Sequence, residues 1–285
     1  MDWFPEMRIL ITGLALFSAL AAAALALGAW RWQRTTERLR ARMREAAAPP
    51  EAAHSALPEP VRRYLELVIE PGRAPVRSVE IRHEGQFRMS EAADSWRPFV
   101  SRQMTTARPP GFDWDARIRM LPGVPVYVRD GYVRGEGGVR AALFGLIPVM
   151  SAEGAPEIAR GQLLRYLAEA MWYPTALLPG QGVTWEATGH RSARATLRDG
   201  EVAAQAEFRF GEDGLLKEVF APDRPRAVGK GFVPAPWAGR MWNYEWRDGL
   251  RIPLEAEVEW RLPGGPLPYW RGRITEIRFS SSQQK

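Results

Sequence analysis

A run of 22 residues without a charged side chain, Ile9–Trp30, constrains this chain more than any other feature. At 1.5 Å per residue a helix of that length measures about 33 Å, enough to cross a hydrocarbon core of about 30 Å. Trp30 and Trp32 close the run in the manner of an interfacial aromatic belt. The preceding segment is acidic and the run is longer than a signal-peptide core, so we expect a transmembrane helix at 9–30 rather than a cleaved signal peptide.

The charges that flank this run predict its orientation. Arg8 is the single basic residue before it, whereas six arginines follow within residues 31–44. The positive-inside rule then places the N-terminus outside and the large domain on the cytoplasmic side of the inner membrane, with a periplasmic domain as the alternative. We expect residues 31–56 to form a basic juxtamembrane helix and a linker. Its arginines either set only the topology or also meet anionic headgroups.

Composition narrows the classes of function. The chain has no cysteine, which excludes disulfides and cysteine chemistry. After residue 44 no basic cluster follows, so the sequence does not predict nucleic-acid binding. It contains no GxGxxG, P-loop or HExxH motif, and we predict neither a cofactor nor a metal. We divide the chain into an N-terminal segment 1–8, the span 9–30, the juxtamembrane region 31–56, one β-rich domain at 57–280 and a tail at 281–285.

Alternation of apolar and polar residues dominates the predicted domain. Val79–Met89 has period two and predicts a half-buried strand. Helical spacing appears in Leu57–Glu70 and again in Pro156–Trp172. The predicted fold class is α+β: a curved, mostly antiparallel sheet, or half-barrel, packed on one or two helices. Hairpin turns are expected at Asp130-Gly131, Asp199-Gly200, Asp213-Gly214, Asp248-Gly249 and Gly264-Gly265.

The end of the second predicted helix is the best candidate for a ligand site. Trp172 and Tyr173 lie beside a proline there, and form either the mouth of an apolar pocket or a plug in the core. If they form a pocket, Arg165 and Glu169 are expected to meet a ligand head group, although their i, i+4 spacing also allows them to pair with each other. The expected lining residues are Trp172, Tyr173, Leu177, Trp114 and Phe87.

A second candidate is the pair Asp113 and Asp115. Residues two apart in a strand share a face, so these carboxylates could bind a metal or perform acid–base chemistry. The alternative is a solvated acidic face beside Arg117 and Arg119. The sequence identifies no catalytic residue. His83 falls on the apolar face of its strand, which is typical of a core histidine.

Several segments together resemble a family. LPEPVRRYL, EIRHEGQFRM, GFDWDARIRM, VYVRDGYVRGEG, RYLAEAMWYPTALL and YEWRDGLRIPLEAEVEW, spread over residues 57–280, resemble an uncharacterised family of bacterial membrane-anchored domains with no assigned function. The expected meander around a helix is also similar in architecture to the lipoprotein-carrier half-barrel, which holds acyl chains in an apolar concavity. That likeness implies an apolar ligand, but shared architecture does not establish shared function.

These observations predict a membrane-tethered module that binds an apolar or lipid ligand in a cavity between sheet and helix. One alternative is a membrane-tethered hydrolase that uses Glu169 with Asp113 or Asp115. Another is a structural or assembly protein whose sheet edge pairs with a partner.

Overall fold

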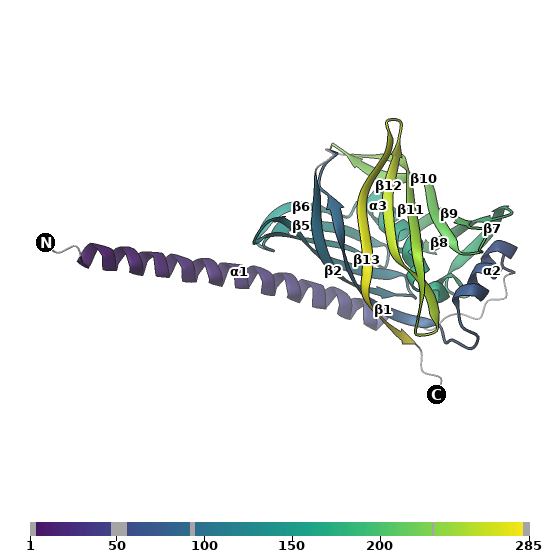
Figure 1. Cartoon of the computed structure of the whole chain (residues 1–285), viewed down its shortest axis with the longest axis horizontal. Coiled ribbons are helices and arrows are strands. Elements are labelled where there is room, and N and C mark those ends of the chain that lie inside the picture. Colours follow the sequence, from purple (N-terminus) through teal and green to yellow (C-terminus); the bar gives the residue numbers. More distant parts are fainter. Residues whose placement is uncertain (1–3, 47–55, 92–94, 230, 282–285) are drawn as a thin grey trace.

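The computed structural model describes residues 4–46, 56–91, 95–229 and 231–281. Its first element is one unbroken helix, α1 (Phe4–Ala46), whose N-terminal part projects away from the rest of the protein (Figure 1). Its apolar stretch has a mean hydropathy of 2.3 over 18 residues, and none of that stretch is buried. The helix is therefore long and apolar enough to cross a membrane. Residues 47–55 of the predicted juxtamembrane region at 31–56, and most of the tail, lie outside the described residues.

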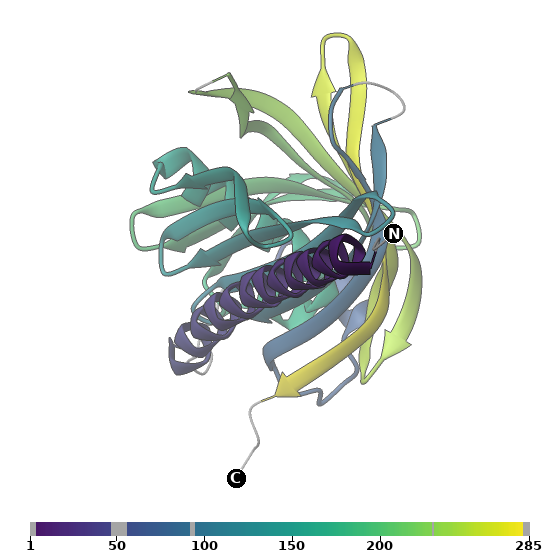
Figure 2. The same ribbon diagram turned by 90° about the vertical axis from the view of Figure 1, so that its left-hand side faces the viewer.

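A single antiparallel sheet of 13 strands follows, in the order β6-β5-β4-β3-β2-β1-β13-β12-β11-β10-β9-β8-β7. Consecutive strands are neighbours in the sheet with one exception, because β6 and β7 form its two opposite edges; β1 pairs with β13 and so joins the two halves. The strands curve around an interior, which confirms the predicted half-barrel (Figure 2). The strands are β1 (Val76–Arg88), β2 (Trp96–Thr106), β3 (Gly111–Leu121), β4 (Val124–Val133), β5 (Glu136–Leu143), β6 (Ile147–Glu153), β7 (Val183–Gly189), β8 (Ser192–Asp199), β9 (Val202–Phe210), β10 (Leu216–Val228), β11 (Gly231–Arg247), β12 (Leu250–Leu262) and β13 (Gly265–Ser281).

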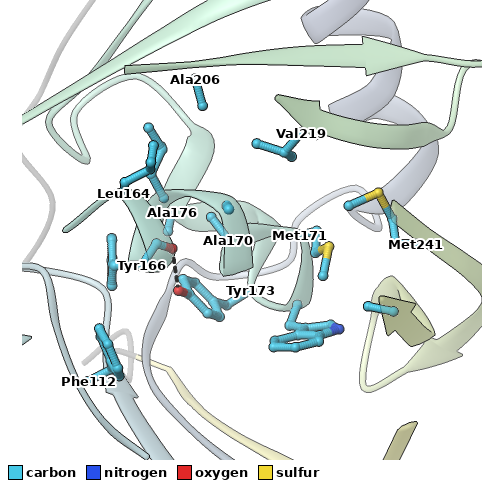
Figure 3. Close-up of a cluster of buried hydrophobic side chains, with 14 of the residues drawn as sticks. Phe112, Leu164, Tyr166, Ala170, Met171, Tyr173, Ala176, Ala206, Val219 and Met241 are labelled. Carbon is cyan, nitrogen blue, oxygen red and sulfur yellow. Dashed lines mark hydrogen bonds between the residues drawn. The ribbon is translucent and has the colours of Figure 1, made fainter. Parts of the chain in front are cut away.

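Helix α3 (Pro156–Glu169) lies against the inner face of the sheet, in contact with β4, β5, β9 and β10. Pro156 stands in its first turn, where the missing amide hydrogen costs nothing. Two short 3-10 helices, η1 (Ala170–Trp172) and η2 (Pro174–Leu177), continue the chain into the core. Figure 3 shows the core around these elements, with the hydroxyl of Tyr173 donating to the backbone oxygen of Tyr166 at 2.8 Å.

The predicted helix at Leu57–Glu70 is shorter in the structure, where α2 spans Glu59–Val68. It packs across the end of the sheet that carries the β9–β10 and β11–β12 turns, away from the free stretch of α1 (Figure 1). Its buried face includes Val61, Tyr64 and Val68. The register of the strands puts other turns at the opposite end of the sheet, and we call five of them the rim. The rim consists of the turns β1–β2, β3–β4, β5–β6, β10–β11 and β12–β13.

One predicted turn is wrong. Asp130-Gly131 lies inside β4, and the chain reverses four residues later at Arg134 and Gly135, where φ is 51° and 81°. A tight two-residue hairpin turn of this type requires two successive residues with positive φ. Residues 130–135 contain two dipeptides that end in glycine, and the turn forms at the second of them. Asp130 is instead an ion-pair partner of α3. The turn at Asp248-Gly249 is as predicted, with φ of 47° and 72°.

The C-terminal half of α1 packs along the outer face of the sheet, over β2, β3 and β4. Trp32, Thr36 and Met43 are buried there although they belong to the predicted surface helix. Their spacing of four and seven residues puts them on one face of α1. Met43 packs against Met104 and Val133. The outer face of the sheet is therefore covered by the continuation of the apolar helix.

Candidate functional site

A cavity of about 740 Å³ lies between the inner face of the sheet and α3. This volume falls within the range of about 300–1,000 Å³ that is usual for small-molecule pockets. Both halves of the sheet supply its wall, since β3, β4 and β5 face β10, β11 and β12 across it. Figure 3 shows three of its deeper side chains, Met171, Val219 and Met241. Five tryptophans line it: Trp114, Trp172, Trp237, Trp260 and Trp270.

The cavity opens at the rim. Met89, Val149 and Met150 belong to its lining, and they are 40%, 63% and 48% exposed. Its deep end is tightly packed, with Trp114 and Trp172 at 2% and 3% exposed. The indole of Trp172 donates to the backbone oxygen of Pro253 at 3.0 Å. The site is thus a blind apolar pocket with one open end.

Five of the seven residues predicted to bind a ligand lie together on this cavity. They are Phe87, Trp114, Arg165, Glu169 and Trp172. Tyr173 and Leu177 do not line it, because they point into the packed core behind η1 and are 1% and 0% exposed. The sequence left a pocket and a core plug as alternatives, and both are present. Trp172 lines the pocket, whereas the next residue, Tyr173, is packed in the core.

The two charged residues of α3 are held by neighbours. Arg165 Nη1 lies 2.7 Å from Asp130 Oδ2, and Arg165 Nε lies 2.6 Å from Glu169 Oε1. The amide of Gln103 donates to the other oxygen of Glu169 at 2.6 Å. Burial raises the pKa of Asp130, which Arg165 opposes. In this polar cluster, one guanidinium is shared by two carboxylates in the wall of the pocket, and the positive charge of Arg224 also acts on Asp130.

Two residues that line the cavity each carry a buried polar atom without a hydrogen-bond partner among the described residues. Trp114 Nε1 and Gln162 Oε1 are buried and form no hydrogen bond within the described residues. Buried donors and acceptors are nearly always satisfied in folded proteins, so each such atom requires a reason. Arg224 also lines the pocket, stacked 4.7 Å from the ring centre of Trp237, with no carboxylate in ion-pair range among the described residues.

Sequence reasoning missed Gln162 and Arg224. Gln162 lies one helical turn before Tyr166 and next to the apolar stripe of α3, so a polar residue at a core position was the available signal. Arg224 lies in β10, between Pro222 and Pro225. Nothing in the local pattern indicated that the strand continues to Val228 and brings this side chain to the pocket.

His83 lies behind the pocket as a core histidine. It is 2% exposed, and its ring centre lies 5.0 Å from that of Trp172. Ser101 Oγ is within 3.3 Å of its Nδ1. Burial, with a smaller contribution from the positive charge of Arg165, lowers the pKa of His83 to about 3. The imidazole is therefore neutral at physiological pH.

Asp113 and Asp115 do not form the solvated face that was one alternative. They lie on the outer face, under α1, and Asp113 is completely buried. Arg40 Nε is 2.7 Å and Arg129 Nε 3.3 Å from the carboxylate of Asp113. Burial raises the pKa of Asp113, and these two guanidinium groups oppose that shift. The indole of Trp32 donates to Asp115 at 2.7 Å.

This arrangement separates the carboxylates that the hydrolase hypothesis combines. Glu169 faces the interior from α3, whereas Asp113 and Asp115 face α1 on the other side of β3. Asp113 pairs with two arginines and Glu169 with Arg165, so none of them is a free base. No three His, Asp or Glu side chains in the described part of the chain are grouped as a metal site.

Solved structures show distant likeness to this fold. A LolA superfamily protein from Nitrosomonas europaea is 7% identical, with a TM-score of 0.40 over 81% of this chain and 96% of that one. A domain from Vibrio parahaemolyticus, described as an outer membrane lipoprotein-sorting protein, is 9% identical, with a TM-score of 0.39 over 73% and 87%. A beta-barrel-like protein of the DUF1849 domain from Brucella abortus gives 10% identity and a TM-score of 0.27 over 73% and 100%.

At these scores the strands superpose only loosely, and the likeness says nothing about a ligand. No curated protein matches the chain. The sequence itself matches one family over residues 55–279, which includes the whole sheet except its last residues and all of the pocket. The chain belongs to DUF6920, a family of unknown function.

Proposed function

We propose that this protein is a membrane-tethered module that binds a lipid, or another ligand with an acyl chain, in the cavity between sheet and α3. The observation that carries the proposal is the cavity itself: about 740 Å³, open at one rim and lined by five tryptophans. Each methylene group removed from water stabilises binding by about 0.8 kcal/mol, so ten methylenes contribute about 8 kcal/mol before the costs of association.

The polar atoms without partners indicate where the head group lies. An acceptor on the ligand suits Trp114 Nε1, a hydroxyl or amide donor suits Gln162 Oε1, and a negative charge suits Arg224. Arg165 and Glu169, which the sequence proposed for this role, support the wall of the pocket through their mutual ion pair. A ligand with an apolar tail and a polar end of this kind fits the lining best.

The tether follows from α1. Its apolar stretch is unburied and its continuation is packed on the sheet, so the span and the domain form one body. A tethered pocket meets membrane lipids at a high effective concentration. The arginines after the span favour a domain on the cytoplasmic side of the inner membrane. A reporter fused after Lys285 would test that side, and a reporter active only in the periplasm would overturn the orientation.

The pocket itself can be tested by photocrosslinking in membranes. The full chain, in vesicles that contain a diazirine-bearing palmitate or phospholipid, is irradiated and its labelled peptides are identified by mass spectrometry. Adducts are expected on α3 and on β11, and also on the span, which serves as an internal reference for contact with bulk lipid.

Gly161 provides a matched pair of variants. It lines the cavity in the middle of α3, and a Cβ added there would meet no atom within 4 Å. Gly161→Phe is expected to fill the cavity and to remove most adducts on α3 and β11, but not those on the span. Gly161→Ala removes a flexible glycine and stabilises the helix by up to about 1 kcal/mol with the cavity still open. Equal labelling of α3 in the two variants would overturn the proposal.

A further inference from the structure

The β5–β6 hairpin exposes apolar side chains that its own sheet does not need. Ile147, Val149 and Met150 are 59%, 63% and 48% exposed. Leu121, in the neighbouring β3–β4 turn, is 64% exposed. β6 is one of the two edge strands of the sheet, and its residues are exposed almost throughout. A contiguous exposed apolar surface of this kind marks a contact with a partner or a membrane.

The position of this hairpin relative to α1 is fixed by a close contact. A Cβ on Gly28 would lie 2.3 Å from Cγ of Leu146 and 3.1 Å from the backbone oxygen of Phe144. Only a glycine therefore lets the β5–β6 turn approach the helix so closely. The turn is built for this approach, since Phe144 and Gly145 both have positive φ, 56° and 71°. Figure 1 shows β5 and β6 beside α1, where the helix leaves the sheet.

This contact lies at the end of the apolar run. From Ile9 to Gly28 the helix rises by about 30 Å, which is the thickness of a hydrocarbon core. When that stretch crosses a bilayer, Gly28 and the hairpin tip lie at the level where the hydrocarbon meets the headgroups. Trp30, 53% exposed, lies at the same level, as interfacial tryptophans do.

The same hairpin is part of the cavity wall. Val149 and Met150 line the pocket from β6. The apolar surface is thus continuous from the exposed tip at Ile147 into the pocket. A second copy that paired with the free edge of β6 would also cover these residues, but nothing about such pairing explains why the tip is held against the end of the span.

We propose that the β5–β6 hairpin inserts its tip into the interface of the bilayer that α1 crosses, and that it forms the passage by which an acyl chain moves between membrane and pocket. The inference rests on the proposed membrane tether. The hairpin contributes apolar area at the interface, in the way that amphipathic anchors do. The rim beside β6 is then the side of the pocket that faces the lipid.

The depth of single spin labels tests this inference. The chain has no cysteine, so single-cysteine variants need no background changes. Ile147→Cys reports on the tip, Leu20→Cys on the span, and Glu212→Cys on the β9–β10 turn at the other end of the sheet. Each full-length variant carries a nitroxide in vesicles of phosphatidylcholine and phosphatidylglycerol, and the collision rates with oxygen and with a water-soluble nickel chelate are compared.

Oxygen is expected to relax the labels at Leu20 and Ile147 more than nickel does, and nickel is expected to dominate at Glu212. Val149→Cys gives a second reading if the label at Ile147 disturbs the turn, because Val149 is exposed in the same strand. A label at Ile147 that behaves like the one at Glu212, while Leu20 still reports lipid, overturns the hairpin proposal and leaves the tether intact.

Two other outcomes are distinct. If the label at Leu20 collides mainly with the nickel chelate, α1 does not cross the bilayer, and both the tether and the hairpin proposal are overturned. Spin–spin broadening at Ile147, removed by dilution with unlabelled protein, shows that a second copy covers β6 and overturns insertion into lipid.

Discussion

Arg40 on the juxtamembrane part of α1 lies 2.7 Å from Asp113 on β3, and the next residue of that strand, Trp114, lines the pocket on the other face. Strand β3 thus contacts α1 with its outer face and lines the cavity with its inner face. Arg129 completes the outer pair from β4, and its guanidinium donates to the backbone oxygen of Trp32 at 2.9 Å. The charges at this interface are desolvated, which makes each of them sensitive to loss of its partner.

Asp113→Asn is therefore expected to destabilise the full chain by about 3–5 kcal/mol, because it removes the nearest counter-charge of the buried Arg129 and of the half-buried Arg40. Arg42→Ala is the control, since its pair with Glu136 is exposed on both sides and should change stability by less than about 0.5 kcal/mol. Chemical denaturation in detergent, followed by tryptophan fluorescence, measures both. Similar midpoints for the two variants would contradict a structural role for the buried pair.

Gly28→Leu is expected to separate α1 from the β5–β6 turn, because the added side chain overlaps Leu146. Hydrogen exchange of the amides at 143–150 should become faster, while exchange in β11 and β12 stays unchanged. Gly13→Leu is the matched control in the same helix, where an added Cβ meets no atom within 4 Å. If both variants leave exchange at 143–150 unaltered, the hairpin does not depend on this contact.

His83 makes stability depend on pH below neutrality. Its pKa is about 3 in the folded protein and near its ordinary value of 6.5 in the unfolded chain. Between these values the unfolded chain binds a proton that the native protein does not, so the stabilisation is complete above pH 6.5 and is lost as the pH falls. The expected loss between pH 7.5 and 5.5 is about 1.4 kcal/mol.

The comparison with His83→Leu isolates this contribution, since His54 and His190 remain in both proteins. The difference in unfolding free energy between the two proteins should change by that amount over the same pH interval. A difference that does not vary with pH would mean that folding does not lower the pKa of His83.

Gln162→Leu is expected to stabilise the empty protein, by about 1 kcal/mol or more, because it replaces a buried acceptor without a partner by an apolar side chain. The same change should reduce binding of ligands that carry a hydroxyl or amide donor and spare a simple hydrocarbon. Thermal unfolding without ligand, and crosslinking with acyl probes that differ only in the head group, measure the two effects. A destabilised empty protein would show that Gln162 is satisfied by something other than a ligand.

The period-two segments predicted the sheet well. In an antiparallel sheet with one buried face, apolar and polar residues alternate along each strand, and this alternation is visible in the sequence. Asp130-Gly131 shows the limit of such local signals. The dipeptide favours a turn, but the ion pair between Asp130 and Arg165 and the register with β5 keep the strand straight through it.

The role of Asp113 could not be predicted for a related reason. Its partner Arg40 lies 73 residues away in a segment whose arginines were interpreted through membrane topology. A stripe of Trp32, Thr36, Leu39 and Met43 at helical spacing was present in the sequence, and it could have indicated a buried face on α1. Which surface that stripe covers is a question of long-range packing, which periodicity does not address.

The unbroken course of α1 from Phe4 to Ala46 has a mechanical consequence. Because the helix has no hinge and its second half is packed on the sheet, a tilt of its N-terminal apolar part tilts the whole domain with it. A thinner bilayer forces a long apolar span to lean further from the normal. With α1 crossing the bilayer as proposed, the same angle is imposed on the half-barrel, so the local thickness of the bilayer sets how the open side of the pocket is presented to the lipid surface.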